Sequence, residues 1–193
     1  MRKMNVRALV LIGVFSAISY LLMLLNFPLP PFPNFLLVDF SDVPALIAAL
    51  LYGPLAGVLV ELLKNVLNYF MVGSPTSVPV GHIANFMAGI TFILPTYYVY
   101  HKTKSKKGML AGLATGTAVM ALMMSVLNYY VFLPAYTIFL GAPAMSAPET
   151  KALVVSAILP FNAVKGVMIT IVFMLLFARL SPWLQKQTAV NHV

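Results

Sequence analysis

The chain has 193 residues, of which 61% are hydrophobic and only 8% are charged, whereas about 25% of the residues in an ordinary soluble domain are charged. This composition excludes a soluble enzyme and a disordered tail, and the absence of cysteine excludes a disulfide scaffold. An integral membrane protein remains, with room for about five to seven spanning helices of roughly 20 residues each.

Five apolar stretches follow one another along the chain, at residues 4–26, 43–72, 81–100, 108–134 and 152–180. The second is too long for one crossing, because its length as a helix would be about 45 Å against a hydrocarbon core of about 30 Å. Gly53-Pro54 interrupts it, and a residue that precedes proline disfavours the helical conformation. We therefore predict two helices there, over 43–52 and 54–71; a single kinked and tilted helix is the alternative.

Basic residues distinguish between five and six helices. They gather at the N-terminus, in the segment 102–107 and at the C-terminus, and basic residues mark the cytoplasmic loops of membrane proteins. Six helices place all three regions inside, whereas five would place the lysine-rich segment outside. We predict an all-α integral membrane protein, a single domain over 1–193, with six transmembrane helices and cytoplasmic termini. The net charge of +8 then reflects orientation in the lipid bilayer, and no nucleic acid partner is expected.

The outer connections are rich in proline and glycine. They are predicted at 27–42, 73–80 and 135–151, and each either contributes to a binding surface or merely joins two helices.

Polar residues within the predicted helices share one depth. In this topology they lie in the outer halves of the helices or just beyond them, and the inner halves hold few comparable groups. Polar groups inside a membrane usually face the protein interior or a cavity. We therefore predict one polar cavity open to the outside, formed around Asp39, Asp42, Asn65, Asn68, His82, Asn85, Asn128, Asn162 and Lys165.

The charged residues have alternative interpretations. Lys165, on the same helix face as Asn162, either contacts a ligand or extends to the outer interface. Asp42 is expected to cap the helix that begins at Val43, which leaves Asp39 as the better ligand candidate. Glu61 and Lys64 are three residues apart, so they are expected to neutralise each other in the membrane.

Asn128 and His82 also remain open. Asn128, beside Tyr129 and Tyr130, either forms part of a binding wall or makes a hydrogen bond between helices. His82 by itself is more often an interfacial residue than a ligand.

Catalytic and energy-coupling motifs are absent from the sequence. There is no phosphate-binding Gly-x-x-x-x-Gly-Lys-Ser/Thr loop, no His-Glu-x-x-His and no Gly-x-Ser-x-Gly. The three histidines are too scattered for a convincing metal site. We therefore expect neither an enzyme nor a cofactor, but a binding protein without its own energy source. In the first helix, Gly13 and Ala17 provide a small-residue face on which another subunit could dock.

Eight short segments resemble a known family in their order along the chain. They are Leu24–Pro28, Asp39–Pro44, Tyr52–Gly57, Val78–Gly81, Leu127–Tyr129, Leu133–Tyr136, Leu159–Asn162 and Lys165-Gly166. Each is weak alone, but the ordered set in a chain of this length resembles the riboflavin-specific substrate-binding subunits (S components) of the energy-coupling factor transporters.

The resemblance implies a function and partners. Such a protein of a bacterial cell membrane binds riboflavin from outside as a transported substrate. It associates with a membrane coupling protein and two ATPases, and is thought to topple in the membrane. Asn128, Asn162 and Lys165 match the family's flavin-ring contacts. Its binding loops correspond to Asp39 and Phe40 and to a second segment containing Val78, Val80 and Gly81.

Two points remain open in this interpretation. The family usually carries an Ala-x-x-x-Ala motif in its first helix, where this chain has Gly13-x-x-x-Ala17. The main alternative function is a stand-alone secondary porter for a small aromatic or polar solute, which would give flux without ATPases. An intramembrane enzyme is a third hypothesis, against which the missing nucleophile–base pair counts.

Overall fold

The computed structural model describes residues 6–141 and 143–190, and most of them are helical. The α-helices are α1 (Val6–Leu24), α2 (Asp42–Tyr52), α3 (Pro54–Val72), α4 (Val80–Thr103), α5 (Lys106–Leu127), α6 (Leu133–Leu140), α7 (Ala147–Leu153) and α8 (Leu159–Val190). Two π-helical turns, η1 (Asn128–Phe132) and η2 (Val154–Ile158), join α5 to α6 and α7 to α8. Two short strands, β1 (Phe27–Pro28) and β2 (Leu37–Val38), pair antiparallel between α1 and α2.

Five helices of the described chain are long and apolar enough to cross a membrane. They are α1, α3, α4, the continuous Lys106–Leu140 helix and the Ala147–Arg179 part of the last helix. The remaining apolar helix, α2, has 11 residues, so its length is about 16 Å and it does not span a core of about 30 Å by itself. The chain breaks between α2 and α3 at Gly53, whose φ of 94° favours glycine.

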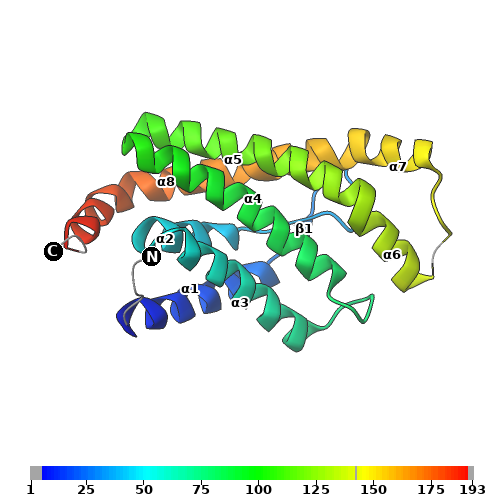
Figure 1. The fold of residues 1–193 in the computed structure, drawn as a ribbon, viewed down its shortest axis with the longest axis horizontal. Helices are drawn as coiled ribbons and strands as arrows, with labels where there is room; N and C mark the ends of the chain where they lie inside the picture. Colours follow the sequence, from blue (N-terminus) through cyan, green and yellow to red (C-terminus); the bar gives the residue numbers. More distant parts are fainter. Residues whose placement is uncertain (1–5, 142, 191–193) are drawn as a thin grey trace.

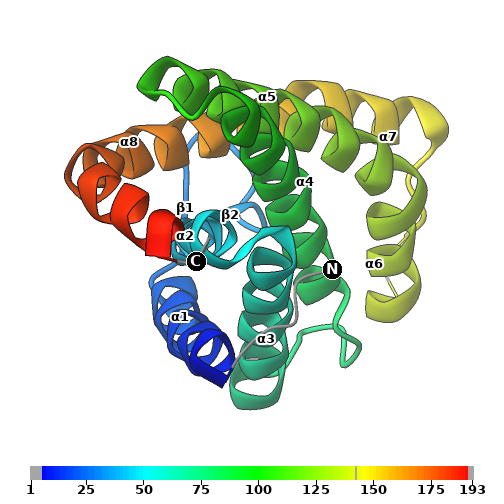
Figure 2. The same ribbon diagram turned by 60° about the vertical axis from the view of Figure 1, so that its left-hand side comes forward.

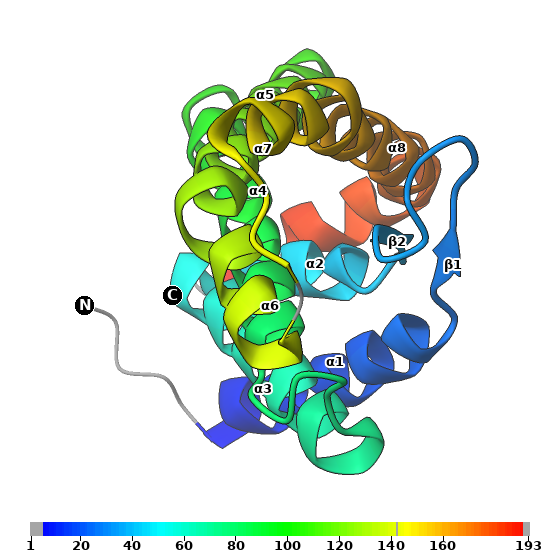
Figure 3. The ribbon, with the colours of Figure 1, turned by 90° about the vertical axis from the view of Figure 1, so that its right-hand side faces the viewer.

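The short helix α2 lies at the centre of the long ones. It contacts α1, α3, α4 and α8, and Figure 3 shows it inside the ring that these helices form. Figures 1 and 2 both show α4 between α3 on one side and α5 on the other. The start of α1, the α4–α5 turn and the end of α8 lie at one end of the molecule, and α6 and α7 lie at the other (Figure 1).

Glycines allow close packing between several of the helices. A Cβ atom on Gly116 would lie 2.4 Å from the Phe92 carbonyl oxygen, and one on Gly112 would lie 2.7 Å from the Thr96 carbonyl oxygen. These contacts bring α5 against α4. Gly57 does the same for α3 and α2, because its Cβ would lie 2.8 Å from that of Ala49. Residues as small as glycine are therefore required where these backbones meet.

Each π-turn immediately precedes a proline. The Leu133 N–H donates to the Asn128 carbonyl before Pro134, and the Leu159 N–H donates to the Val154 carbonyl before Pro160. Proline lacks an N–H and its ring crowds the carbonyl four residues earlier, so a wider turn relieves the crowding. Since η1 and η2 also contact each other, the two proline-linked turns lie side by side.

The sequence predicted an outer connection over 135–151, and these bounds are wrong. Helix α6 continues to Leu140 and α7 begins at Ala147, so only a short connection separates them. Ser146 and Glu149 form a reciprocal capping box at the start of α7. Pro148 lies in the first turn of α7, where a missing N–H is tolerated. The prolines between α1 and α2, in contrast, lie in a connection without α-helix.

Candidate functional site

A buried charge cluster lies where the connection after β2 enters α2. It contains three of the four acidic residues of the chain, Asp39, Asp42 and Glu61, together with Lys64 and Lys165. All five are 3% exposed or less. Burying ions is costly unless they are paired, so the mutual arrangement of these side chains decides whether the cluster is stable.

Lys64 is the most completely paired member. Its Nζ lies 2.6 Å from Asp42 Oδ1 and 2.8 Å from Glu61 Oε2, and it donates to Ser41 Oγ at 2.6 Å. The expected pairing of Glu61 with Lys64 is confirmed. The expected cap is wrong: Asp42 is the first residue of α2 and makes no cap hydrogen bond, because its carboxylate turns to Lys64 instead.

Lys165 is held more loosely than Lys64. Its Nζ lies 3.4 Å from Asp39 Oδ2 and 3.8 Å from Asp42 Oδ2. Asp39 Oδ2 also accepts a hydrogen bond of 3.5 Å from the Asn85 amide. Asp39 is thus surrounded by the Lys165 ammonium and by the Ser41 and Asn85 donors, all of which favour a carboxylate that accepts hydrogen bonds.

The formal charges do not balance. The cluster has three carboxyl groups but only two ammonium groups, so one carboxyl group has no cation of its own. Glu61 Oε1 and Asp42 Oδ2 have no hydrogen-bond partner in the structure. Lys165, with two contacts beyond 3 Å, is thus the cation most able to exchange a protein contact for a ligand contact.

Asparagines extend the polar cluster across α3 and α4. Asn65 donates to Asn85 Oδ1 at 3.3 Å, and Asn68 Oδ1 lies 2.9 Å from His82 Nε2. Asn85 thereby joins Asn65 to Asp39, whereas Asn68 and His82 form a separate pair. The shared depth of these residues predicted one polar cavity, and the structure places them in these two hydrogen-bonded groups.

Asn128 and Asn162 lie on neighbouring segments. Both are buried, and each side-chain amide donates to the carbonyl one turn earlier, Met124 for Asn128 and Ile158 for Asn162. Asn128 begins η1, whereas Asn162 follows η2 by one turn of α8 and precedes Lys165 by another. The adjacent π-turns therefore bring these two amide-bearing segments together, although no hydrogen bond joins either amide to Asp39 or Lys165 among the described contacts.

Both predicted binding loops make contacts with other residues of the chain. Phe40 is half-buried, and its ring lies 6.5 Å from that of Phe27. In the second loop, the Val78 carbonyl accepts from the Ser74 and Thr76 hydroxyls and from the Val80 N–H. Its carbonyl is therefore occupied and is not a free acceptor for a ligand.

Val80 and Gly81 begin α4. Val80 is buried in the core, and a Cβ on Gly81 would lie 2.8 Å from the Tyr136 hydroxyl of α6. Gly81 thus permits the close approach of α4 to α6.

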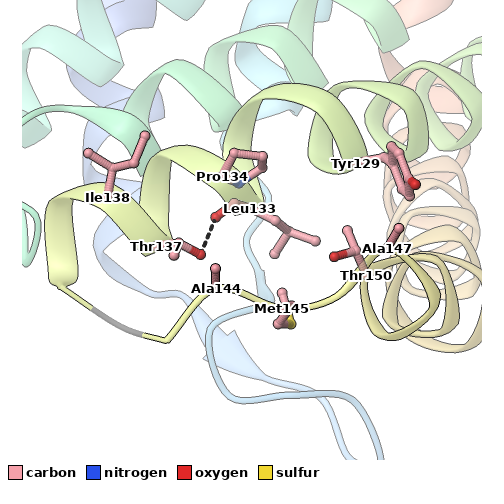
Figure 4. Close-up of a pocket in the computed structure, with 9 residues that line it drawn as sticks. All are labelled: Tyr129, Leu133, Pro134, Thr137, Ile138, Ala144, Met145, Ala147 and Thr150. Atoms are coloured by element: carbon pink, nitrogen blue, oxygen red, sulfur yellow. Dashed lines mark hydrogen bonds between the residues drawn. The ribbon is translucent and has the colours of Figure 1, made fainter.

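A cavity of about 370 Å³ lies between α6 and the connection to α7 (Figure 4). Its lining is mostly apolar and comprises Tyr129, Leu133, Pro134, Thr137, Ile138, Ala144, Met145, Ala147 and Thr150. None of the predicted binding residues lines it, but Tyr129 follows Asn128 directly. The Thr137 hydroxyl is already bonded to the Leu133 carbonyl at 3.1 Å, so this cavity presents chiefly apolar and aromatic surface.

Of the partners of Asp39, Asn85 was predicted only from its depth in the membrane, and Ser41 was not predicted because an isolated serine carries no pattern. Ser41 is fully buried and bonds to both Asp39 and Lys64. Only its position between two acids, in Asp39-Phe40-Ser41-Asp42, could have drawn attention to it. Within the described ranges, no three His, Cys, Asp or Glu side chains are arranged to hold a metal ion.

The predicted docking residues lie on the outside of α1. Gly13 and Ala17 are exposed, and a Cβ on Gly13 would meet nothing within 4 Å. This face of α1 is therefore free of contacts with the rest of the described chain at Gly13.

Comparison with known proteins gives a consistent result. A family model for the substrate-specific component of ECF transporters matches residues 7–177. The riboflavin transporter FmnP of Bacillus subtilis strain 168 is 53% identical over 188 residues, which cover 97% of this chain and 99% of that protein. The riboflavin transporter RibU of Staphylococcus aureus strain TCH60 is 43% identical over 189 residues, which cover 96% and 97% of the two chains.

A solved structure of the S component of a bacterial ECF transporter has the same fold. It is 42% identical in sequence and superposes with a TM-score of 0.78, over 92% of this chain and 97% of that one. The resemblance predicted from the eight short segments is therefore confirmed, as is the prediction of a transport component rather than an enzyme.

Proposed function

Because the chain belongs to the substrate-specific components of the energy-coupling factor (ECF) transporters, we propose that it captures riboflavin outside a bacterial cell for import. The observation that carries this proposal is the likeness, over nearly the whole chain, to proteins named riboflavin transporters. The polar and aromatic groups around α2, α4, α5 and α8 supply the chemistry that such a ligand needs.

Riboflavin is a neutral molecule with a flat ring and a polyhydroxylated ribityl chain. Ring carbonyls and nitrogens require a few well-placed donors and acceptors, whereas the ring faces require apolar or aromatic surface. Asn128, Asn162 and Lys165 are proposed to contact the polar ring edge. Asp39 is proposed to accept hydrogen bonds from ribityl hydroxyls through Oδ2, the oxygen nearest Lys165.

The two binding loops are proposed to enclose the ligand from the outer side. Phe40 contributes an aromatic ring, Val78 and Val80 contribute apolar surface, and Gly81 keeps the start of α4 close to α6. The occupied carbonyl of Val78 is not assigned a ligand contact.

We propose that the protein is a single domain that traverses the plasma membrane six times, with both termini in the cytoplasm. Helix α2 would complete its crossing together with the connection over 25–41, which descends from the outer side to reach it. The start of α1, the α4–α5 turn and the end of α8 lie at the same end of the molecule (Figure 1). This arrangement supports the proposed orientation. That end contains Lys102, Lys104, Lys106 and Lys107, as the positive-inside rule requires for the cytoplasmic side.

The proposed partners are an ECF membrane coupling protein and two ATPases. The sequence lacks a nucleotide-binding loop, so energy must come from other subunits. The exposed Gly13 and Ala17 face of α1 is the proposed docking surface, because small residues let another helix approach closely.

Riboflavin binding to the purified chain tests this function directly. Flavin fluorescence should be quenched on binding at submicromolar to micromolar riboflavin, with one site per chain. Absence of quenching at these concentrations would disprove the proposal. In proteoliposomes, uptake should require the coupling protein, the ATPases and ATP; uptake by the isolated chain would instead indicate a secondary porter.

A further inference from the structure

Ser41 connects three parts of the molecule through one residue. It is fully buried between β2 and α2. Its carbonyl accepts from the Ser19 hydroxyl of α1 at 2.9 Å, and its Oγ accepts from Lys64 Nζ of α3 at 2.6 Å. Both its N–H and its hydroxyl donate to Asp39 Oδ1, the N–H over 2.9 Å.

Because of these contacts, the two oxygens of the Asp39 carboxylate have different partners. Oδ1 is directed to Ser41, which supplies it with two donors. Oδ2 is left to face Asn85 at 3.5 Å and Lys165 at 3.4 Å. Both Oδ2 contacts are long, whereas the Ser41 contacts are short, so the Ser41 side determines how the carboxylate is turned.

We propose that Ser41 is a positioning residue for ligand recognition, acting through Asp39. By holding Oδ1, Ser41 aims Oδ2 at the ligand's hydroxyl groups, and Lys64 in turn holds the Ser41 hydroxyl. Fixing an acceptor before the ligand arrives lowers the cost of ordering it on binding. The inference rests on the proposed riboflavin function. It adds that Ser41 controls recognition of the ribityl chain and not of the flavin ring.

Lumiflavin has the flavin ring without the ribityl chain. Comparing its affinity with that of riboflavin therefore separates recognition of the ring from recognition of the chain. In Ser41→Ala, Asp39 loses its side-chain donor and its orientation. The Kd for riboflavin should rise roughly fivefold, the effect of one hydrogen bond, and the Kd for lumiflavin should not change. Ser16→Ala is the matched control, because Ser16 is also buried and its hydroxyl bonds, among the described residues, only to the Ile12 carbonyl of its own helix. It should change neither affinity.

A double-mutant cycle tests whether the effect passes through Asp39. Once Asp39→Asn has weakened riboflavin binding, adding Ser41→Ala should cause little further loss, because both changes act on one contact. Ser41→Cys, which keeps the side-chain size but donates poorly, replaces Ser41→Ala with the same expectations if the alanine variant does not fold.

Two results would overturn the inference while leaving the proposed function intact. One is an equal loss of riboflavin and lumiflavin affinity in the Ser41 variant, which indicates a general structural role, or no loss of either. The other is full additivity with Asp39→Asn. A wild-type chain that binds neither flavin would instead disprove the proposed function, and this inference with it.

Discussion

Lys165 on α8 and Asp39 before α2 form a buried ion pair across 126 positions of sequence, with Nζ 3.4 Å from Oδ2. Neither charge would be tolerated alone at this burial, because an unpaired buried ion loses its hydration without compensation. The pair joins the last helix to the connection that leads into the central one. It is therefore both a structural contact and the part of the site most open to exchange with a polar ligand.

Replacement of Lys165 by methionine should weaken riboflavin binding strongly. The proposed hydrogen bond to a charged donor is worth about 1.5–3 kcal/mol, which corresponds to roughly a ten- to hundredfold rise in Kd. Fluorescence titration of the purified variant measures this change. Lys151→Met, which removes an exposed lysine of α7, is the control and should bind as the wild type does. Unchanged affinity in Lys165→Met would move the ligand away from this lysine.

Alanine at Asn128 or Asn162 should raise the Kd for riboflavin by roughly five- to tenfold each, because a ring group would lose a hydrogen-bond partner in a buried site. Lumiflavin should be affected equally, since these residues are proposed to contact the ring. Ser125→Ala provides the comparison, because Ser125 also bonds to a carbonyl one turn earlier but lies outside the proposed site. Wild-type affinity in both asparagine variants would exclude them as ring contacts.

Lys64 and Glu61 should differ sharply in their tolerance to substitution. Lys64→Met leaves the carboxylates of Asp42 and Glu61 without their closest cation, and loss of one partner of a buried pair costs about 3–5 kcal/mol. Glu61→Gln leaves two carboxyl groups for two ammonium groups and keeps the shape, so its stability should stay within about 1 kcal/mol of wild type. Thermal unfolding in detergent compares the two. Equal destabilisation would show that charge balance does not govern this cluster.

Gly116→Ala should destabilise the α4–α5 contact. The added Cβ would lie 2.4 Å from the Phe92 carbonyl oxygen, which is backbone and cannot turn away. Overpacking of this kind costs about 1–3 kcal/mol, which thermal unfolding would detect as a lower Tm. Ala118→Val adds volume at an exposed position of the same helix and should leave Tm unchanged. Similar Tm values for both variants would mean that the helices can separate without cost.

Gly13→Leu should separate partner docking from ligand binding. No atom from another part of the described chain lies within 4 Å of a Cβ at this position, so folding and riboflavin affinity should be those of the wild type. ATP-driven riboflavin uptake with the coupling subunits should fall severalfold, because the larger side chain keeps the partner helix away. Ala114→Leu, on the exposed face of α5, serves as the control. Normal uptake by the Gly13 variant would place the docking surface elsewhere.

Composition and charge distribution by themselves determined that this is a helical membrane protein, because 8% charged residues cannot cover a water-soluble surface. The Gly53-Pro54 dipeptide located the break before α3, since its effect on the backbone is local. The depth of the asparagines in the predicted helices also indicated most of the polar residues around Asp39. The direction of a helix and the residue number together determine how deep a side chain lies in the membrane.

Only the tertiary structure decided how the charges are shared. Local spacing pairs Glu61 with Lys64, but it cannot show that Asp42 turns from its own helix end to Lys64, or that Ser41 orients Asp39. Those contacts connect residues more than twenty positions apart or depend on the choice of side-chain conformation. They form because burial leaves each ion and hydroxyl no water to bind, so each must take its partner from whichever helix packing brings nearby.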